Sequence, residues 1–441
     1  MDYLRDSHRA LLSRLLPSAM GTLLSETITS LVDSIVLAYY LGADMMATIS
    51  VSMPIYLAVN TIAMLIASGG ATVFAQSLGR GDEEEAQRCF SCSALLMLLC
   101  GALMTLVGVP FVRQIVLLLG GDGVFEATVA YSRIQFLFMV PLLLYQLLVV
   151  FVRFDGGTTR TVVSTVVCSV VNLLLDVLLV GHLGAGATGA AMATCLAYTA
   201  AMLVNAGHFI SGRRNLVFRR GSLTMPRVQR ILRTGVPLSL SQLGMAVETA
   251  LFNNFAGAYG GVMYQNVYGV IVQISGIIWA VYEGIAQACQ PIMATCFGAG
   301  NRARLDRTLR IGMRLETGLM AVVTAVCLIA PGLVAELFSM NEPTQRSIAV
   351  TAVRIYSLSL LFTSQNTMYV YYYQAQKREK LATLIVLLSG TVLPILFLYL
   401  LSAFIGVNGI WWSYLCAQGL TLAFCAAYHL RQRRRGAYEA K

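Results

Sequence analysis

Charged residues are scarce in this chain of 441 residues. Asp, Glu, Lys and Arg together make up 12% of it, about half of the roughly 25% found in ordinary soluble proteins. Hydrophobic residues make up 57%, and apolar stretches of about 20 residues, the length that spans a bilayer, fill nearly the whole sequence. The composition excludes a soluble fold and predicts an all-α membrane protein that crosses the bilayer many times.

Patterns that would support catalysis are also missing. The chain has four histidines, and it contains no H-E-x-x-H, G-x-S-x-G or Walker motif; the segment FDGGTTR lacks the Walker lysine and spacing. Cys89 and Cys92 form a C-x-x-C pair, but without a second pair or a nearby histidine it does not predict a metal or redox centre. We therefore expect no enzyme and no cofactor, and an ion gradient is the expected energy source.

Gly, Pro and charge clusters divide the apolar sequence into twelve predicted spans. These cover residues 15–40, 47–78, 89–119, 127–153, 159–181, 187–211, 228–258, 262–297, 308–338, 347–375, 379–403 and 409–430.

Lys and Arg are distributed unevenly between the predicted loops. With the N-terminus in the cytoplasm, 26 of the 31 Lys and Arg residues fall on that side, whereas the opposite loops hold only Arg346. This asymmetry is a strong positive-inside signal. We expect a multi-pass protein of the inner (plasma) membrane with both termini in the cytoplasm. Topology then accounts for the net charge of +10, and no binding of nucleic acid is expected.

The two halves of the chain resemble each other at an offset of about 220 residues. Arg133-Ile134 matches Arg354-Ile355, and Asp33 matches Asn253. Six spans per half is an even number, so both halves run the same way through the membrane, and a substrate path is expected between them. The predicted domains are an N-lobe (1–211), a basic cytoplasmic linker (212–227), a C-lobe (228–430) and a basic cytoplasmic tail (431–441).

Several motifs resemble those of a known transporter family. The first half contains LPSAMGTLLSETITSLVDSIVLAYYLGA, SGGATVFAQSLGRGDEEEAQR, FVRFDGGTTR and VVNLLLDVLLVGHLGAGATGAAMAT, and the second contains VPLSLSQLG, FNNFAGAYGG and GIAQACQPIMATCFGAG. They resemble, span by span, the multidrug and toxic compound extrusion (MATE) family, in its DinF-like branch. The resemblance implies two six-helix lobes forming a V around a central cavity, with alternating access driven by sodium or protons.

Four polar side chains are predicted at matched depth in the N-lobe. A charge at the bilayer centre costs at least about 2.5–3.5 kcal/mol, so acids within spans require a reason. At 1.5 Å per residue, Asp33, Asn172, Asp176 and Thr194 all lie roughly 8–14 Å below the outer surface. Such oxygens suit Na+, and two neighbouring carboxylates suit proton exchange. The resemblance places the family's cation site at the same positions. The alternative is a structural cluster that holds spans 1, 5 and 6 together.

Other acids within the spans allow more than one interpretation. Glu26 lies two turns before Asp33 and either passes protons or cations deeper or is a solvated acid facing the cytoplasm. Glu248 is expected to be a cavity acid for cationic substrates. Glu283 either faces substrate or pairs with an arginine. Glu316 is expected to be solvated near the cytoplasmic end of its span.

Together these features predict a monomeric secondary transporter that exports small organic, mainly cationic, molecules in exchange for Na+ or H+. A lipid-linked sugar flippase of the same superfamily is the nearest alternative. Such a protein handles an anionic pyrophosphate and would be expected to place several cations in its cavity, whereas the charges in the middle of these spans are acidic and the arginines stay near the interfaces. A membrane-embedded enzyme is a more distant alternative.

Overall fold

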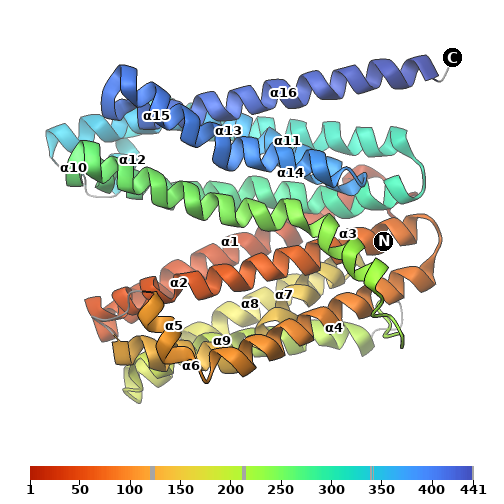
Figure 1. Ribbon diagram of the computed structural model, residues 1–441, viewed down its shortest axis with the longest axis horizontal. Coiled ribbons are helices and arrows are strands. Elements are labelled where there is room, and N and C mark those ends of the chain that lie inside the picture. The colour runs from red at the N-terminus through yellow and green to blue at the C-terminus, as the bar shows by residue number, and fades with distance from the viewer. Residues whose placement is uncertain (120–124, 211–214, 338–339, 341, 440–441) are drawn as a thin grey trace. The chain divides into compact units, whose positions relative to one another are not determined.

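The computed structural model describes residues 1–119, 125–210, 215–337, 340 and 342–439, and these residues form helices and no strands (Figure 1). Residues 212–214 of the predicted linker and 440–441 of the predicted tail lie outside the described residues. The α-helices are α1 (His8–Leu41), α2 (Ala43–Ala63), α3 (Gly69–Gly79), α4 (Glu83–Gly108), α5 (Val112–Leu118), α6 (Phe125–Leu137), α7 (Met139–Phe154), α8 (Thr158–Leu175), α9 (Gly186–Ala206), α10 (Met225–Gly298), α11 (Arg302–Ile329), α12 (Pro331–Leu337), α13 (Pro343–Ala375), α14 (Glu379–Leu387), α15 (Leu393–Ile405) and α16 (Gly409–Glu439). Three π-helical segments, η1 (Met64–Ser68), η3 (Asp176–His182) and η5 (Leu388–Val392), and two 3-10 turns, η4 (Gly207–Ile210) and η6 (Gly406–Asn408), join some of them.

The predicted number of spans is confirmed. Among the described residues, nine helical stretches are long and apolar enough to cross a membrane, and the bent pair α6–α7 makes a tenth. Two of the nine, α10 with 74 residues and Glu379–Gln432 with 54, are more than twice as long as the ~30 Å hydrocarbon core. Each is interrupted by a glycine with positive φ, Gly261 or Gly406. Each therefore holds two spans, so the total is twelve spans in an all-α fold, as predicted.

Two predicted spans differ in detail. The span predicted over 89–119 is too long, because α4 ends at Gly108, ahead of Pro110, and α5 is a separate short helix. The fourth span bends by 57° between α6 and α7. Pro141 lies at the start of α7, and it has no N–H to bond the carbonyl four residues earlier, so the helix cannot continue straight through this point.

Contacts divide the chain into two compact units. The first unit comprises Met1–Ser239 and Ala294–Arg302, and the second comprises Leu240–Met293 and Ala303–Lys441. In the first unit α8 packs on α1 and α9, and α7 packs on α4 and α9; in the second, α16 packs on α13 and α15.

The internal repeat is visible in the backbone. Residues with positive φ recur in pairs 219 to 221 positions apart, and each pair ends a helix or connects two spans. The pairs are Gly42 and Gly261, Gly81 and Gly300, Gly156 and Lys377, and Gly186 and Gly406. Lys377 is the one non-glycine residue with positive φ among the described residues. The two halves of the sequence therefore turn at the same places.

Close helix packing within the first unit depends on two repeat-related glycines. A Cβ at Gly79 would overlap the carbonyl oxygen of Thr295, and a Cβ at Gly298 would overlap that of Gln76. The ends of α3 and α10 therefore touch backbone to backbone, as small residues allow in membrane proteins.

We expect Gly298→Ala to destabilise the protein by about 1–3 kcal/mol, because the added methyl group meets a backbone carbonyl that cannot rotate away. Gly318→Ala in α11 is the matched control, since nothing lies within 4 Å of a Cβ there. Thermal unfolding in detergent measures both variants. Equal stability of the two would contradict the close packing.

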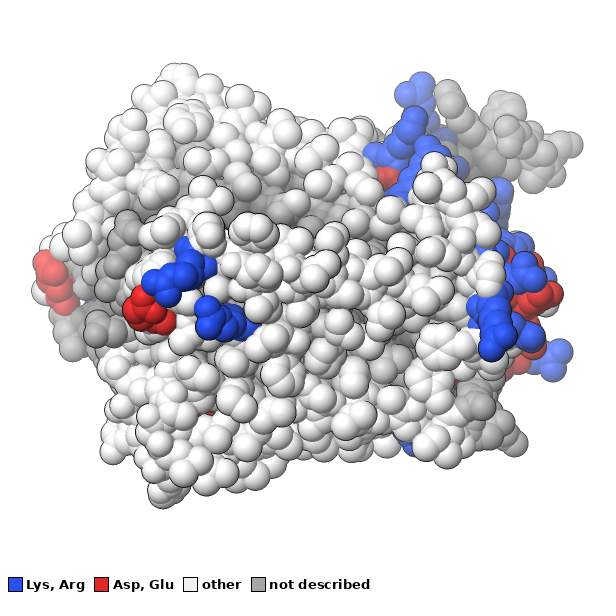
Figure 2. Space-filling view, turned by 60° about the horizontal axis from the view of Figure 1, so that its bottom comes forward, with Lys and Arg blue, Asp and Glu red and all other residues white. Residues whose placement is uncertain are grey.

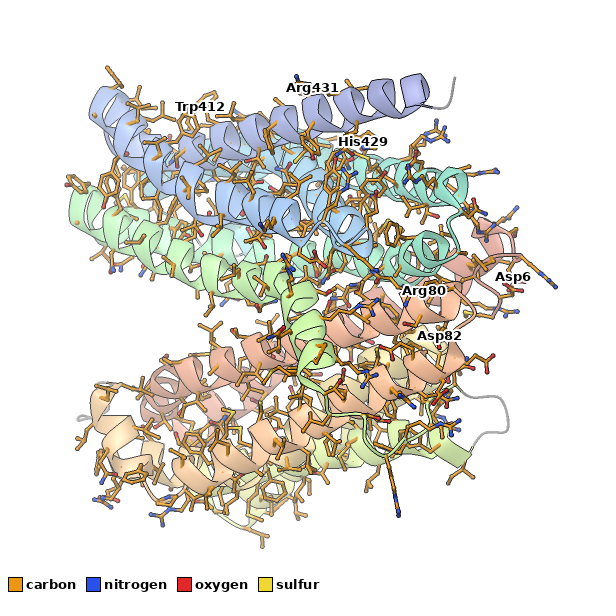
Figure 3. The ribbon with its side chains drawn as sticks, turned by 45° about the vertical axis from the view of Figure 1, so that its right-hand side comes forward. Asp6, Arg80, Asp82, Trp412, His429 and Arg431 are labelled. Carbon is orange, nitrogen blue, oxygen red and sulfur yellow. The ribbon has the colours of Figure 1, made fainter. Side chains whose placement is uncertain are left out.

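The surface has the character expected for a lipid environment. Side chains such as Leu106 (73% exposed), Ile329 (83%) and Phe404 (79%) are apolar and uncovered. On the face in Figure 2, charged side chains gather in a few groups, and most of the remaining surface is without them. Within the first unit Asp6, Arg80 and Asp82 lie at one end of the helices (Figure 3).

Candidate functional site

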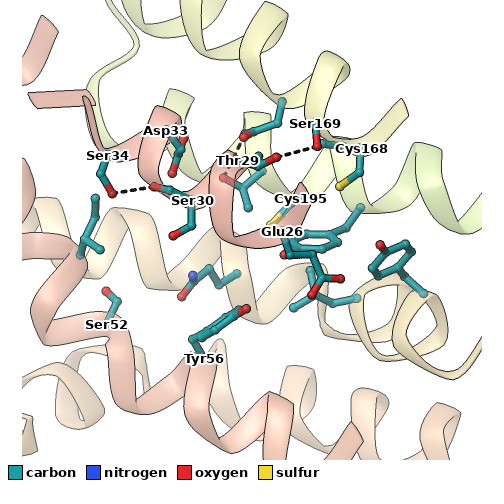
Figure 4. Close-up of a pocket in the computed structure, with 18 of the residues that line it drawn as sticks. Glu26, Thr29, Ser30, Asp33, Ser34, Ser52, Tyr56, Cys168, Ser169 and Cys195 are labelled. Atoms are coloured by element: carbon teal, nitrogen blue, oxygen red, sulfur yellow. Dashed lines mark hydrogen bonds between the residues drawn. The ribbon is translucent and has the colours of Figure 1, made fainter. Parts of the chain in front are cut away.

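A row of hydroxyl groups joins α1 to α8 in the first unit. Ser18 Oγ and Thr161 Oγ1 are 2.6 Å apart, and further along Thr29 Oγ1 and Ser169 Oγ are 2.5 Å apart (Figure 4). The hydroxyls of Thr161 and Ser169 also donate to the carbonyls of Thr158 and Thr165 on their own helix, so the contacts suit two helices packed closely in lipid. The row fixes the register that brings Asp33 of α1 alongside the end of α8.

A cavity of about 180 Å³ lies in the first unit, between α1, α2, α6, α7, α8 and α9. Most of its lining residues have a side-chain oxygen: Glu26, Thr29, Ser30, Asp33, Ser34, Ser52, Tyr56, Tyr131, Gln135, Tyr145, Thr165, Ser169, Asn172, Thr194 and Tyr198. The volume is below the ~300–1,000 Å³ of pockets that enclose a drug-sized molecule. It is enough for an ion with several waters, at ~30 Å³ per water.

The structure brings the four predicted site residues together at this cavity. Asp33, Asn172 and Thr194 line it, and Asn172 Nδ2 donates to Thr194 Oγ1 at 3.5 Å. Asp176 is fully buried behind the wall, with its carboxyl group close enough to that of Asp33 to interact. Asp176 begins the π-helical segment η3, and such a local widening of a helix is frequent at functional sites.

Several oxygen atoms at this site have no hydrogen-bond partner among the described residues. They are Asp33 Oδ1, both carboxyl oxygens of Asp176 and Gln135 Oε1. A buried oxygen without a donor costs free energy, so each of these atoms requires a proton, a water or a cation. The concentration of acceptors in one small cavity is the strongest indication of a ligand site in the first unit.

Sequence reasoning missed Gln135 and Tyr145. Gln135 lies two residues from Arg133, near the end of its span. Its place in the sequence is therefore that of a residue at the membrane–water interface. The bend between α6 and α7 brings it into the cavity wall. Tyr145 follows that bend on α7, and no periodicity in one sequence distinguishes it from apolar filling.

Glu26 lines the same cavity as Asp33. Seven residues separate the two acids on α1, which corresponds to roughly 10 Å along the helix. Figure 4 shows Glu26 and Asp33 on the same helix, with Thr29 and Ser30 on the turn between them. The arrangement fits the first of the two interpretations of Glu26, an acid that faces the path to Asp33.

A second cavity, of about 200 Å³, lies in the second unit, and Glu248 is the acid in its wall. The remaining lining is largely aromatic: Phe252, Tyr268, Trp279, Tyr282, Tyr356, Trp411 and Tyr414. Trp411 Nε1 is buried without an acceptor among the described residues. A carboxylate among aromatic faces is suited to an organic cation, because the rings attract a cation through their π-electrons.

The two cavities occupy repeat-related places. Many lining residues correspond at offsets of 219 to 221, among them Asp33 and Phe252, Gln135 and Tyr356, and Thr194 and Tyr414. The pairing of Asp33 with Asn253 in the sequence is off by one, because Gly42 and Gly261 set the local offset at 219. The same fold thus holds a cavity rich in oxygen ligands in one unit and an aromatic cavity in the other.

Two acids lie where the sequence did not predict them. Glu316 is fully buried rather than solvated, because α11 begins at Arg302 and Glu316 lies near the middle of the helix. Glu283 is 7% exposed and does not line either cavity described above. Its partners are the Tyr371 hydroxyl and Gln287, and no arginine pairs with it among the described residues.

The described residues include no group of three or more His, Cys, Asp or Glu side chains that could hold a metal ion. Cys89 and Cys92 are both buried and free, and Cys89 Sγ lies 3.6 Å from Glu85 Oε1. The predicted Na+ site includes amide and hydroxyl groups, so it is a different kind of set.

Two repeated units of six spans, each with its own cavity within the bundle, define a polytopic helical protein with the architecture of secondary transporters. The MatE family model matches residues 17–178 and 237–400, about three quarters of the chain. The chain therefore belongs to the MATE family of membrane transporters.

Relatives and solved structures agree with this assignment. The chain is 26% identical to the multidrug export protein MepA of Staphylococcus haemolyticus over 435 residues, covering 96% of this chain and 94% of that protein. It is 25% identical over 440 residues to MepA of Staphylococcus aureus, with the same coverage.

Its fold matches an outward-facing MATE family transporter of the MOP superfamily with a TM-score of 0.91 at 21% identity, covering 100% of this chain and 98% of that one. It also matches a MOP superfamily transporter from Pyrococcus furiosus with a TM-score of 0.90 at 22% identity, with the same coverage.

Proposed function

We propose that the protein is an antiporter that exports small organic cations in exchange for Na+ or H+, and that the first cavity binds the coupling ion. The observation that carries this proposal is the set of unpartnered acceptors around Asp33 and Asp176. No Lys or Arg lines this cavity among the described residues, so the two carboxyl groups have no protein cation beside them. Na+ or a proton satisfies such a site, because either places positive charge among oxygen ligands.

The organic cation binds at Glu248 in the second cavity. The carboxylate supplies the countercharge and the surrounding rings supply the apolar and cation–π contacts. The volume of about 200 Å³ fits the charged end of a substrate rather than a whole drug-sized molecule. Glu26, in the first cavity, offers a second acidic contact on the substrate's path. The multidrug export named for the Staphylococcus relatives fits aromatic walls that tolerate varied shapes.

The flippase alternative is disfavoured by the charge of both cavities. Neither wall carries a Lys or Arg among the described residues, and both contain acids. A pyrophosphate would be repelled by such walls. The proposal includes a monomer in the inner (plasma) membrane with both termini in the cytoplasm, because the Lys and Arg residues concentrate on that side.

Purified protein in lipid vesicles tests the function. An imposed Na+ or pH gradient should drive efflux of a cationic dye, and collapse of the gradient should stop it. If neither gradient moves the dye and the protein instead moves a lipid-linked sugar, the protein is the flippase and not an exporter of organic cations.

The predicted orientation can be tested in the segment before α10. Ser222 is buried and its hydroxyl donates to the Arg219 carbonyl at 2.6 Å, whereas Leu223 is 48% exposed. We expect Leu223→Cys, in a variant without native cysteines, to react in intact cells only with membrane-permeant thiol reagents. Val107→Cys, 46% exposed and near the opposite end of α4, is the matched control that impermeant reagents should reach. If impermeant reagents instead reach Leu223→Cys and not Val107→Cys, the orientation of the protein is opposite to the predicted one.

A further inference from the structure

Two acids in the second unit are buried outside both cavities and have no countercharge. Glu316 of α11 is 0% exposed and Glu283 of α10 is 7% exposed. Neither forms an ion pair among the described residues. A buried ionised carboxylate without a partner charge is strongly unfavourable, and such a group takes up a proton instead.

Both carboxyl groups face α13. Gln365 Nε2 of α13 lies 3.5 Å from Glu316 Oε2, and it also donates to the Met313 carbonyl at 3.2 Å. The Tyr371 hydroxyl, further along α13, donates to Glu283 Oε1, and Gln287 Nε2 donates to the same oxygen at 3.3 Å. The two acids thus lie on adjacent stretches of one polar strip.

One atom of this strip requires a further ligand. Glu316 Oε1 is fully buried and has no hydrogen-bond partner among the described residues. The groups that interact electrostatically with the pair are Tyr282 and Cys289 of α10, Tyr371 of α13, and the two glutamates themselves. None of these groups is a cation, so a proton on the Glu316 carboxyl group is the simplest way to remove its buried charge.

The first unit shows that the fold does not need acids here. At the offset of 219 set by the paired glycines, Glu283 corresponds to Met64 and Glu316 to Met97. Met97 is fully buried, so an apolar side chain packs well at this place. The buried acids are a feature added in the second unit alone.

We propose that Glu283 and Glu316 form a proton-binding site in the second unit, separate from the candidate ion site at Asp33 and Asp176. At neutral pH the proton lies on a carboxyl oxygen of the pair, and it passes to water when this part of the bundle is solvated. Tyr282 lines the Glu248 cavity and interacts with both acids, so it links the pair to the place where the organic cation binds. Transport then depends on pH even when Na+ fills the first cavity.

Infrared spectroscopy of the full chain in lipid tests the proposal directly, because a protonated carboxyl group has its own carbonyl band. The Asp33→Asn, Asp176→Asn background removes the other acid pair from the spectrum. We expect a carboxyl band at pH 7 that is lost or shifted in Glu316→Gln and in Glu283→Gln. Glu342→Gln, an exposed acid at the start of α13, should leave the band unchanged.

Stability provides an independent measurement. A proton held in the folded state and released on unfolding makes stability fall as the pH rises through neutrality. Glu316→Gln should reduce this slope by about one proton per molecule. Should Glu316→Gln fail to fold, Glu316→Met, which copies Met97 of the first unit, replaces it.

A wild-type spectrum without the band would overturn the proposal. A band and a pH slope of stability that survive in the Gln or Met variant would do the same. So would a stabilisation by Na+ that Glu316→Gln removes.

Discussion

Asp33→Asn should abolish gradient-driven export while leaving the protein inserted and folded. The amide keeps the shape of the side chain but cannot exchange a proton or offer a charged oxygen to Na+. Because no Lys or Arg lines the cavity beside Asp33 among the described residues, removal of its charge leaves no opposite charge unpaired, and stability should be unchanged or higher. Dye efflux from vesicles and thermal unfolding of the same preparation measure the two effects.

The matched control for this variant is Glu342→Gln, which makes the same chemical change at an exposed position. It should transport at the wild-type rate. Full gradient-driven efflux in Asp33→Asn would remove Asp33 from the coupling site. Loss of folding in that variant would instead indicate the structural cluster that the sequence left open.

Glu248→Gln should lower export of a permanently charged quaternary ammonium dye by about tenfold or more, the factor that corresponds to 1.4 kcal/mol of lost binding. The carboxylate is the acid among the rings of the second cavity, and its attraction for a cation has no substitute there. Trp279→Ala should lower export of the same dye, and Trp279→Phe, which keeps an aromatic face, should lower it less.

A neutral substrate distinguishes a charge effect from general damage. Its export should be nearly unchanged in Glu248→Gln, because only the ionic contact is removed. Equal loss for charged and neutral substrates would assign Glu248 to the transport cycle rather than to recognition of the cation.

The placement of the candidate ion site could be predicted because it depends on how deep each residue lies in the membrane. Asp33 and Asp176 belong to different spans, but span length and a rise of 1.5 Å per residue place both near the same level. Bringing them together then requires only that α1 and α8 pack, and the hydroxyl row from Ser18 to Ser169 provides that contact.

Residues whose position depends on a local bend could not be predicted in this way. Gln135 enters the first cavity because the chain bends by 57° just after it. The aromatic cavity left a weak signal in the sequence, since Tyr268, Ser275, Trp279 and Tyr282 recur at helical spacing on one face of α10. In a chain so rich in apolar residues, that stripe is indistinguishable from packing against lipid.

Glu316 was misplaced for a different reason. The segment from Arg302 to Arg310 carries four arginines, and this charge predicts a loop over most of it, so the predicted span begins only at residue 308. The structure continues the helix through this basic segment, which moves Glu316 from the expected edge of the membrane to the middle of the helix. Positive charge reports which side of the membrane a segment faces, but it does not report whether that segment is helical.

The most direct test of the central claim is whether the coupling ion stabilises the protein through the first cavity. An ion that binds only the folded state raises stability by RT ln(1 + [L]/Kd), so the shift in melting temperature with Na+, or with pH in the Glu316→Gln background, reports binding. We expect Asn172→Ala and Thr194→Ala each to remove most of the shift, and the double variant to lose little more, because ligands of one ion are not additive. Glu248→Gln should keep the shift. A shift that survives in Asn172→Ala and disappears in Glu248→Gln would place the coupling ion in the second unit and contradict the assignment.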